Sequence, residues 1–271
     1  MNMTTSEEGN ASFVRMPENR LLKKLRSGKT AVGTCAYSFS PDIVQLAGYC
    51  GMDFCRIDNE HAWRQDNALE NMIRASYLSG TVAVSRVDRG NPYLVRKVLE
   101  IGSQAVLVPQ VESRRETQEI IDAAKFPPVG TRGFGNLNAS GRYGIVDSRE
   151  WMDWSNSETM VGIMIETAKA LDEIDGIMSL PGLDFVLIGT SDLSLSLGLS
   201  KPSSGDPKVL DCVRRITASA RSHGKYVMIG VGKPWVENAR KFIEMGCHMI
   251  ELGHDYTVLR DVWSDLVKAV G

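Results

Sequence analysis

Two carboxylates, Glu166 and Asp192, stand just past two short apolar runs, and acids in this pattern could hold a metal ion. The runs cover 161–165 and 185–188, and apolar runs of this length are typical of buried parallel strands. Acids at neighbouring strand ends, without cysteine or histidine beside them, suit Mg²⁺ or Mn²⁺, with Co²⁺ as a further candidate. An acid after a strand can also be only a helix N-cap or the partner of an arginine, so spacing alone leaves the metal open.

A second group of reactive side chains follows two earlier runs. Asp58, Glu60 and His61 come after the run 53–57, and Arg86 comes after the run 81–84. If all these runs end at one rim, Arg86 supplies a positive charge that can stabilise a developing oxyanion. His61 supplies a titratable base. Together with a metal, these are the requirements of enolate chemistry. The structural alternatives are a hydrogen-bonded His61 and an Arg86 that only pairs with Glu60 or Asp58.

The other histidines are weaker candidates from the sequence. His223 lies beside a turn glycine, and His248 stands at the start of an apolar run. His254 follows that run at the expected rim, with only Asp255 near it in sequence.

The elements that position these residues alternate between short apolar runs and helical patterns. The expected strands are 31–35, 53–57, 81–84, 105–108, 161–165, 185–188, 226–229 and 249–252. Strands that alternate with helices in this way predict a (β/α)₈ barrel, with active-site residues at the C-terminal strand ends. A doubly wound open sheet is the alternative. A short basic helix at 19–27 is expected to close the bottom of the barrel, and 168–177 is expected to be one helix.

The long connection at 125–158 interrupts this alternation. Long loops in compact domains are usually functional or mobile, so a lid over the site is expected here. Its glycines do not form a dinucleotide or phosphate-binding fingerprint. The possible hinges are Gly133, Gly135, Gly141 and Gly144.

Composition narrows the class of protein. The 271 residues fit one barrel domain at 17–271 after a flexible N-terminal tail at 1–16. A net charge of −2 and a pI near 6.1 do not indicate a basic surface that could bind nucleic acid. No stretch of the sequence is apolar and long enough to span a membrane. The five scattered cysteines, with no CxxC pair, are typical of reduced thiols, so a cytoplasmic enzyme is expected.

Six ordered motifs carry a resemblance to a known family. They read IDNEHA at 57–62, SRVDRGNPYLVRKVLEIG at 85–102, VLVPQVES at 106–113, FPPVGTRG at 126–133, IMIET at 163–167 and LIGTSDLSLSLG at 187–198. In this order the chain resembles the HpcH/HpaI aldolases, which are class II, metal-dependent pyruvate aldolases. That family includes the 2,4-dihydroxyhept-2-ene-1,7-dioate and 2-dehydro-3-deoxy-sugar-acid aldolases.

The resemblance implies a fold, an assembly and a set of roles. The implied fold is the (β/α)₈ TIM barrel of the phosphoenolpyruvate/pyruvate type, with its last helix exchanged between subunits of a hexamer, a dimer of trimers. Glu166 and Asp192 match the metal ligands, and Arg86 matches the arginine that holds the pyruvyl oxygen. His61 with Asp58 matches the acid–base region.

The segment from Gly189 to Asp192 matches the substrate-binding loop. Within it, the N–H groups of Ser191 and Asp192 match those that receive the substrate carboxylate, and the loop also contains Thr190.

The chain departs from the family pattern at several positions. Glu100 stands where an aspartate normally partners the histidine, so the dyad with His61 is longer, redirected or absent. Met164 replaces a common glutamine, and Thr190 replaces a proline. Trp63 and Arg64 give the loop after the second strand unusual side chains.

The expected reaction is cleavage or formation of a 4-hydroxy-2-oxo acid through a pyruvate enolate, giving pyruvate and an aldehyde. One alternative keeps the enolate but uses oxaloacetate, as a decarboxylase or a citrate-synthase-like condensing enzyme. A second alternative is a catalytically silent barrel with a binding role. Small-molecule 2-oxo acids and aldehydes are the expected partners.

Overall fold

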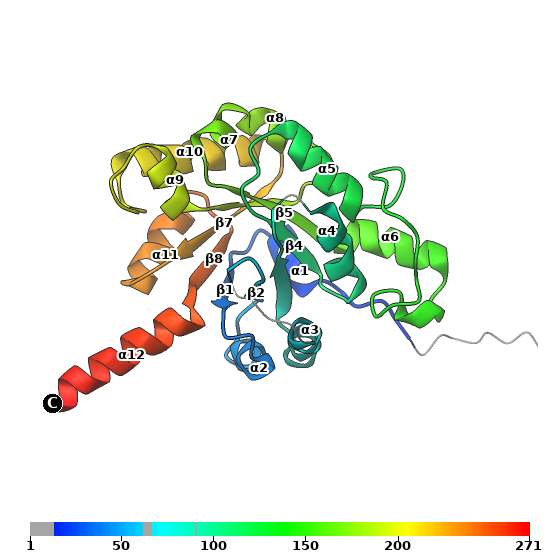
Figure 1. Cartoon of the computed structure of the whole chain (residues 1–271), viewed down its shortest axis with the longest axis horizontal. Helices are drawn as coiled ribbons and strands as arrows, with labels where there is room; N and C mark the ends of the chain where they lie inside the picture. The colour runs from blue at the N-terminus through cyan, green and yellow to red at the C-terminus, as the bar shows by residue number, and fades with distance from the viewer. Residues whose placement is uncertain (1–13, 62–66, 90) are drawn as a thin grey trace, which may run out of the picture.

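Eight parallel strands close into a barrel in which each strand pairs with the next along the chain, and β8 pairs with β1 (Figure 1). The computed structural model describes residues 14–61, 67–89 and 91–271. The (β/α)₈ barrel is thus confirmed and the open sheet is wrong. Most of the expected N-terminal tail, and both Trp63 and Arg64, lie outside the described residues.

The observed strands lie within one or two residues of the expected ones. They are β1 Ala31–Ala36, β2 Phe54–Asp58, β3 Val82–Arg86, β4 Ala105–Val108, β5 Met160–Ile165, β6 Phe185–Ile188, β7 Tyr226–Val231 and β8 Met249–His254. The helices are α1 Arg20–Arg26, α2 Pro41–Tyr49, α3 Ala68–Ser79, α4 Pro92–Glu100, α5 Arg114–Ala124, α6 Ser148–Glu158, α7 Ala168–Asp172, α8 Ile174–Met178, α9 Thr190–Ser196, α10 Pro207–Ser222, α11 Trp235–Glu244 and α12 Asp255–Val270. The helix expected at 168–177 is therefore two short helices, which meet at Glu173.

Inward-facing side chains fill the lower barrel and leave its upper end polar. Phe54 and Phe185 are fully buried there, and both need a glycine opposite them. A Cβ on Gly33 would overlap the ring of Phe54, and a Cβ on Gly162 would overlap the ring of Phe185. This pairing of large and small residues closes the lower interior, so a cavity can open only above it.

Helix α1 closes the bottom of the barrel, as expected. Leu21, Leu22 and Leu25 pack on the interior apolar cluster and are almost fully buried. Asn19 caps the helix by accepting from Leu22 N, and its Nδ2 donates to Gln104 O at 3.1 Å and Glu158 O at 2.8 Å. These carbonyls lie just before β4 and β5, so the cap fixes α1 at the N-terminal strand ends.

The expected lid at 125–158 is wrong. This connection runs from the end of α5 to the start of β5 and contains α6, so it lies at the N-terminal end of the barrel. Lys125 Nζ donates to Thr159 O at 2.6 Å, and Trp154 Nε1 donates to Pro17 O at 2.7 Å, beside α1. The segment supports the base of the barrel and cannot cover its opposite mouth.

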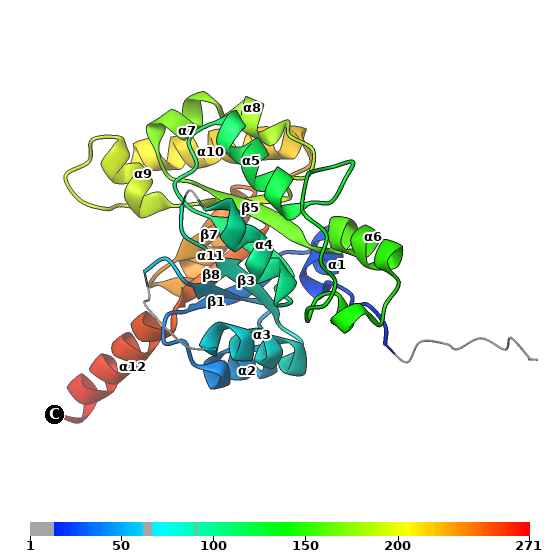
Figure 2. The ribbon, with the colours of Figure 1, turned by 45° about the vertical axis from the view of Figure 1, so that its right-hand side comes forward.

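Helix α12 projects away from the barrel, with its end far from the strands (Figures 1 and 2). Among its residues only Asp255, at the start, is buried. The carboxylate of Asp255 anchors that start by accepting hydrogen bonds from Tyr37 N and Ser38 N. The apolar side chains along the rest of the helix, including Trp263 and Leu266, are exposed.

Candidate active site

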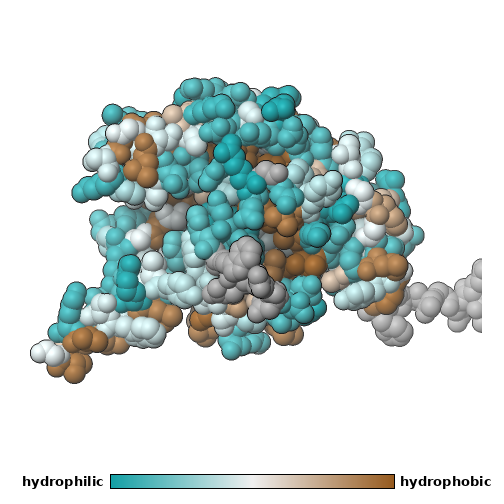
Figure 3. Space-filling model, in the orientation of Figure 1, coloured by the Kyte–Doolittle hydropathy of each residue, from teal (hydrophilic) through white to brown (hydrophobic). Residues whose placement is uncertain are grey.

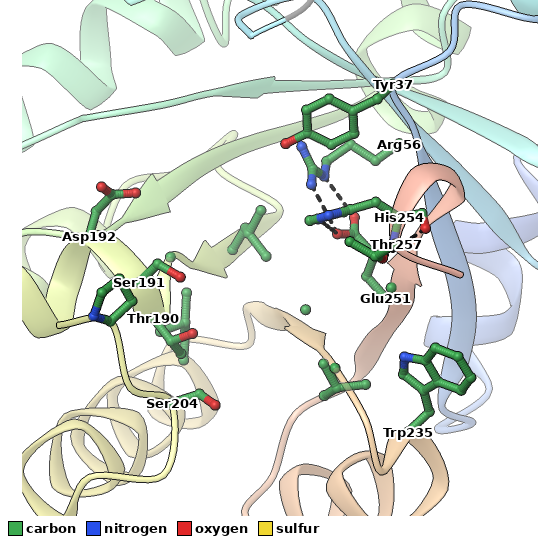
Figure 4. Close-up of a pocket in the computed structure, with 18 of the residues that line it drawn as sticks. Tyr37, Arg56, Thr190, Ser191, Asp192, Ser204, Trp235, Glu251, His254 and Thr257 are labelled. Atoms are coloured by element: carbon green, nitrogen blue, oxygen red, sulfur yellow. Dashed lines mark hydrogen bonds and ion pairs between the residues drawn. The ribbon is translucent and has the colours of Figure 1, made fainter. Parts of the chain in front are cut away.

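A cavity of about 670 Å³ opens at the C-terminal end of the barrel. One wall carries Thr190, Ser191 and Asp192 from the start of α9, and the facing wall carries Glu251 and His254 from β8 (Figure 4). Arg56, His61 and Arg86 also line this cavity. Residues from β2, β3, β6 and β8 therefore meet at one rim, as the barrel requires.

Glu166 is a buried acid without an ion-pair partner in the part of the chain that the structure describes. It directly follows β5, is 3% exposed, and accepts a hydrogen bond on Oε1 from Gln110 N at 2.6 Å. No ion pair to Glu166 occurs within the described ranges. Burial raises the pKa of Glu166, and the nearby charges of Asp192 and Glu60 raise it further. A cation between Glu166 and Asp192 would relieve this repulsion.

Gly189 makes room for the Glu166 carboxylate. A Cβ at this position would lie 2.6 Å from Glu166 Oε2 and 2.7 Å from Glu166 Cβ. Any side chain there would push the carboxylate away. Glu166 and Asp192 both offer carboxylate oxygens, and Glu166 is buried beside a glycine that leaves room for its carboxylate. These features fit a divalent cation held by Glu166 and Asp192.

The sequence did not single out Gln110. Its backbone has φ 53°, a left-handed conformation that non-glycine residues rarely adopt, and in it the N–H donates to Glu166. The contact depends on a backbone conformation, and the residue type gives no sign of it.

Asp58 is the centre of a buried ionic network. It ends β2, is fully buried, and accepts from Arg56 Nη1 at 2.7 Å and from Arg86 Nη2. It also caps the following turn by accepting from the backbone N–H groups of Glu60 and His61. Burial opposes its ionisation, but the two arginines lower the pKa of Asp58 to about 2. Asp58 is therefore an anion that orients cations, and it is a poor proton acceptor at neutral pH.

The network extends to β8 through Arg56 and Glu251, neither of which the sequence analysis selected. Arg56 Nε donates to Glu251 Oε2 at 2.7 Å, and Arg56 Nη2 donates to Glu251 Oε1 at 2.9 Å. Burial opposes the charge on Glu251, but Arg56 lowers the pKa of Glu251 to about 2. The available signal was a charged residue inside each apolar strand, FCRID and MIELGH.

Arg86 lies at the end of β3 and is 4% exposed. Its Nη1 lies 2.9 Å from Glu60 Oε2 and also donates to Met164 Sδ at 3.5 Å. Its Nε is buried and has no hydrogen-bond partner among the described residues. Arg86 thus keeps a donor for a further oxygen while Asp58 and Glu60 hold its guanidinium. The sequence offered a simple pairing of Arg86 with these acids as its alternative, and both pairs are present.

His61 lies in the turn after β2 and borders the cavity with a largely exposed side chain. Its Nε2 lies 3.8 Å from Glu60 Oε2. Glu100 lies elsewhere, in the last turn of α4, where its carboxylate lies 3.6 Å from Arg96 Nε and its carbonyl accepts from Ser140 N. The structure of one chain therefore does not bring Glu100 to His61, and their dyad stays a prediction.

A closed parallel barrel with a buried acid, a second acid and an arginine at its C-terminal end is typical of (β/α)₈ enzymes, whose active sites lie at that end. Residues 33–261 match the model of the HpcH/HpaI aldolase/citrate lyase family, and the chain belongs to that family. It is similar to the 2-keto-3-deoxy-L-rhamnonate aldolase of Klebsiella pneumoniae, with 31% identity over 88% of this chain and 87% of the relative. Further curated relatives are also named aldolases.

Solved structures show the same fold. An HpcH/HpaI aldolase from Desulfitobacterium hafniense superposes with a TM-score of 0.85 at 28% identity, covering 92% of this chain and 96% of that one. Citrate synthase SbnG superposes with a TM-score of 0.82 at 26% identity, covering 93% and 98%.

The family and the enzyme class, a carbon–carbon lyase, are thereby confirmed. The curated names do not favour the oxaloacetate alternative, and they give no support to a silent barrel.

Proposed function

We propose that this chain is a divalent-metal-dependent aldolase that cleaves or forms a 4-hydroxy-2-oxo acid through a pyruvate enolate. The observation that carries the proposal is Glu166, a buried carboxylate with a raised pKa and no basic partner among the described residues, beside Asp192. Glu166 and Asp192 would hold Mg²⁺ or Mn²⁺, with Co²⁺ as a further candidate. A divalent cation at this position would stabilise the negative charge that develops on the oxygens of a 2-oxo acid, and so favour its enolate.

Arg86 would bind the oxygen on which the enolate charge develops. Asp58 and Glu60 hold its guanidinium in place, and its buried Nε has no partner among the described residues. A preorganised donor of this kind is typically worth about 3 kcal/mol to the transition state. Asp58, with a pKa of about 2, would act by orienting Arg86.

The substrate carboxylate would lie against the segment from Gly189 to Asp192, which lines the cavity at the start of α9. A histidine would take the proton from the 4-hydroxyl group as the C3–C4 bond breaks. His61 is the histidine that the family motif assigns to this step. Loss of the proton and cleavage of the bond would give the aldehyde and the pyruvate enolate, which is then protonated at C3.

The proposed assembly is the hexamer of the family, with α12 exchanged between subunits. Its support is the exposed apolar surface on α12, which is visible as a hydrophobic patch at the far end of this helix (Figure 3). The proposed compartment is the cytoplasm, and the five free cysteines favour it. No described helix is long and apolar enough to cross a membrane.

The test is a pyruvate-release assay with a set of 4-hydroxy-2-oxo acids, coupled to lactate dehydrogenase. We expect release that EDTA abolishes and that added Mg²⁺ or Mn²⁺ restores. Loss of oxaloacetate is measured in parallel. Turnover of oxaloacetate alone, or release that survives complete chelation, would contradict the proposal.

A further inference from the structure

Tyr37 lies at the mouth of the barrel, and the proposed reaction gives it no role. It directly follows β1, is partly buried and lines the cavity. Its hydroxyl group points into the cavity (Figure 4). The hydroxyl oxygen has no hydrogen-bond partner among the described residues. Because a few fixed polar groups usually orient the ligand in such a cavity, this hydroxyl is available to bind a substrate.

The backbone around Tyr37 is held in one conformation. The N–H groups of Tyr37 and Ser38 both donate to the carboxylate of Asp255, at 3.0 Å and 2.9 Å. Phe39 then has φ 52°, a left-handed conformation that non-glycine residues rarely adopt. Backbone strain of this kind is found mostly at functional sites, where the surrounding structure imposes it. The path of the chain after β1 is therefore fixed on both sides of the tyrosine.

The ring of Tyr37 packs against the imidazole of His254, with 4.9 Å between the centroids. Both nitrogens of that imidazole are engaged. The side chain caps α12 by accepting from Thr257 N, and Nε2 lies 3.6 Å from Glu251 Oε1. The hydroxyl of Thr257 is also used, because it accepts from His254 N and donates to the His254 carbonyl. His254 therefore supports the tyrosine ring, and the Tyr37 hydroxyl is left for a ligand.

The hydroxyl group of Tyr37 stays protonated at neutral pH. Burial raises the pKa of Tyr37, and the negative charge of Asp58 raises it further, although Arg56 opposes this effect. A neutral phenol donates one hydrogen bond and can also accept one. Tyr37 can therefore bind an oxygen of the substrate without taking a proton from it.

The charges around this hydroxyl favour an uncharged partner over a carboxylate. Arg56 and Arg86 are the cations of the buried network, and three acids neutralise them. These acids are Asp58, Glu60 and Glu251. The network therefore offers no free positive charge to an anionic group beside Tyr37. An alcohol, which both donates and accepts, suits the phenol better.

Tyr37 lies across the cavity from the proposed metal ligands. In the closed barrel β5 lies opposite β1, and Glu166 and Asp192 follow β5 and β6. Asp192 and Tyr37 accordingly lie on different sides of the cavity (Figure 4). A 2-oxo acid that is held through C1 and C2 near the metal ligands would extend its aldehyde part toward Tyr37. The cavity of about 670 Å³ has room for both parts.

We propose that Tyr37 is a specificity-determining residue that hydrogen-bonds a hydroxyl group on C5 of the substrate. This inference rests on the proposed aldolase function. The charges of Asp58 and Arg86 both act on Tyr37, so its hydroxyl lies close to the group that would bind the C2 oxygen. The C4 oxygen belongs to the proton-transfer step, and the next oxygen along the substrate is the one on C5. Tyr37 binds that oxygen and takes no part in breaking the C3–C4 bond.

The experiment uses two substrates that differ in one oxygen atom, 4,5-dihydroxy-2-oxopentanoate and 4-hydroxy-2-oxopentanoate. Pyruvate release from each is measured with the metal-loaded wild type, Tyr37→Phe and Tyr256→Phe. Tyr37→Phe keeps the ring that packs on His254 and removes only the hydroxyl. Tyr256→Phe is the matched control, because its ring lies 6.4 Å from that of Tyr37 but does not line the cavity.

The quantity compared is the ratio of kcat/KM for the two substrates, because differences in their intrinsic reactivity cancel between enzymes. We expect Tyr37→Phe to lower kcat/KM about tenfold for the dihydroxy substrate and less than about twofold for the other. In synthesis, KM for glycolaldehyde should rise about tenfold while KM for acetaldehyde stays the same. Tyr256→Phe should keep the wild-type ratio.

Two results would overturn the role of Tyr37. One is an unchanged ratio in Tyr37→Phe. The other is an equal loss with both substrates, which would place the hydroxyl at the C4 oxygen or in the support of the fold. Exchange of the C3 hydrogens of pyruvate in D₂O requires no aldehyde part and should be the same in Tyr37→Phe and wild type. A wild-type enzyme that neither cleaves nor exchanges would instead overturn the aldolase function itself.

Discussion

Arg56 donates from Nη1 to Oδ2 of Asp58 over 2.7 Å inside the barrel, where the Asp58 side chain is fully buried. The same carboxylate also holds Arg86, so one acid orients two cations on neighbouring strands. This shared acid links the residue proposed to bind the enolate oxygen with the ion pair between Arg56 and Glu251. The chemistry of the mouth therefore depends on a network that no single strand contains.

The network should make stability depend on pH. Asp58 and Glu251 have pKa values of about 2 in the folded protein, below their ordinary values of 3.8 and 4.5. Their stabilising contribution is complete above the ordinary values and is lost as the pH falls toward 2. We expect urea midpoints to fall between about pH 5 and about pH 3, and Asp58→Asn should flatten this dependence. At neutral pH, Asp58→Asn should lower the free energy of unfolding by about 3 kcal/mol. An unchanged slope in the variant would contradict the charged network.

Removal of either proposed metal ligand should abolish turnover. Glu166→Gln and Asp192→Asn keep the shape of the side chain but remove a charged oxygen donor, so affinity for Mn²⁺ measured by calorimetry should fall with pyruvate release. The control is Asp211→Asn, an exposed acid on α10. Wild-type Mn²⁺ affinity in Glu166→Gln would show that the ion lies elsewhere.

Gly189→Ala tests the space beside Glu166. The added Cβ would lie 2.6 Å from Glu166 Oε2, so the carboxylate must move and metal affinity should fall about tenfold or more. Gly205→Ala is the matched control, because a Cβ there meets nothing within 4 Å. Equal metal affinities in the two variants would rule out the proposed role of Gly189.

Arg86→Lys should preserve the positive charge but lose activity. A lysine ammonium cannot make the forked contacts of Arg86 with Asp58 and Glu60 while it also offers a donor to substrate. We expect kcat to fall about 100-fold with the fold retained, as judged by circular dichroism and a urea titration. Near-normal kcat would mean that charge alone, without the planar fork, is sufficient.

Leu266→Glu should reduce the size of the proposed assembly. Leu266 is 57% exposed on α12, and a carboxylate within an apolar contact between subunits would be costly. Sedimentation velocity should show smaller species than for the wild type. Lys268→Glu, an exposed change of charge on the same helix, is the control. Identical sedimentation of Leu266→Glu and wild type would remove α12 from the interface.

The sequence was sufficient for the barrel, because eight apolar runs of strand length alternate with helical patterns. It was also sufficient to place Asp58, Arg86 and Glu166 at one end, since residues that follow parallel strands share a rim. The prediction of a lid was wrong for a topological reason. The long segment at 125–158 follows a helix and precedes a strand, so it lies at the N-terminal end of the barrel, opposite the cavity.

Only the tertiary structure could show which charges neutralise one another. Arg56 and Glu251 lie 195 positions apart in sequence, and closure of β8 against β1 brings them within 2.7 Å. The φ of Gln110 and the distance between Glu100 and His61 depend in the same way on backbone paths that residue types do not encode locally. Sequence determined that Asp58, Arg86 and Glu166 reach the mouth, because strands that alternate with helices run parallel and end at one rim. Three-dimensional packing decided how each group is paired, because pairing depends on distances between strands that are remote along the chain.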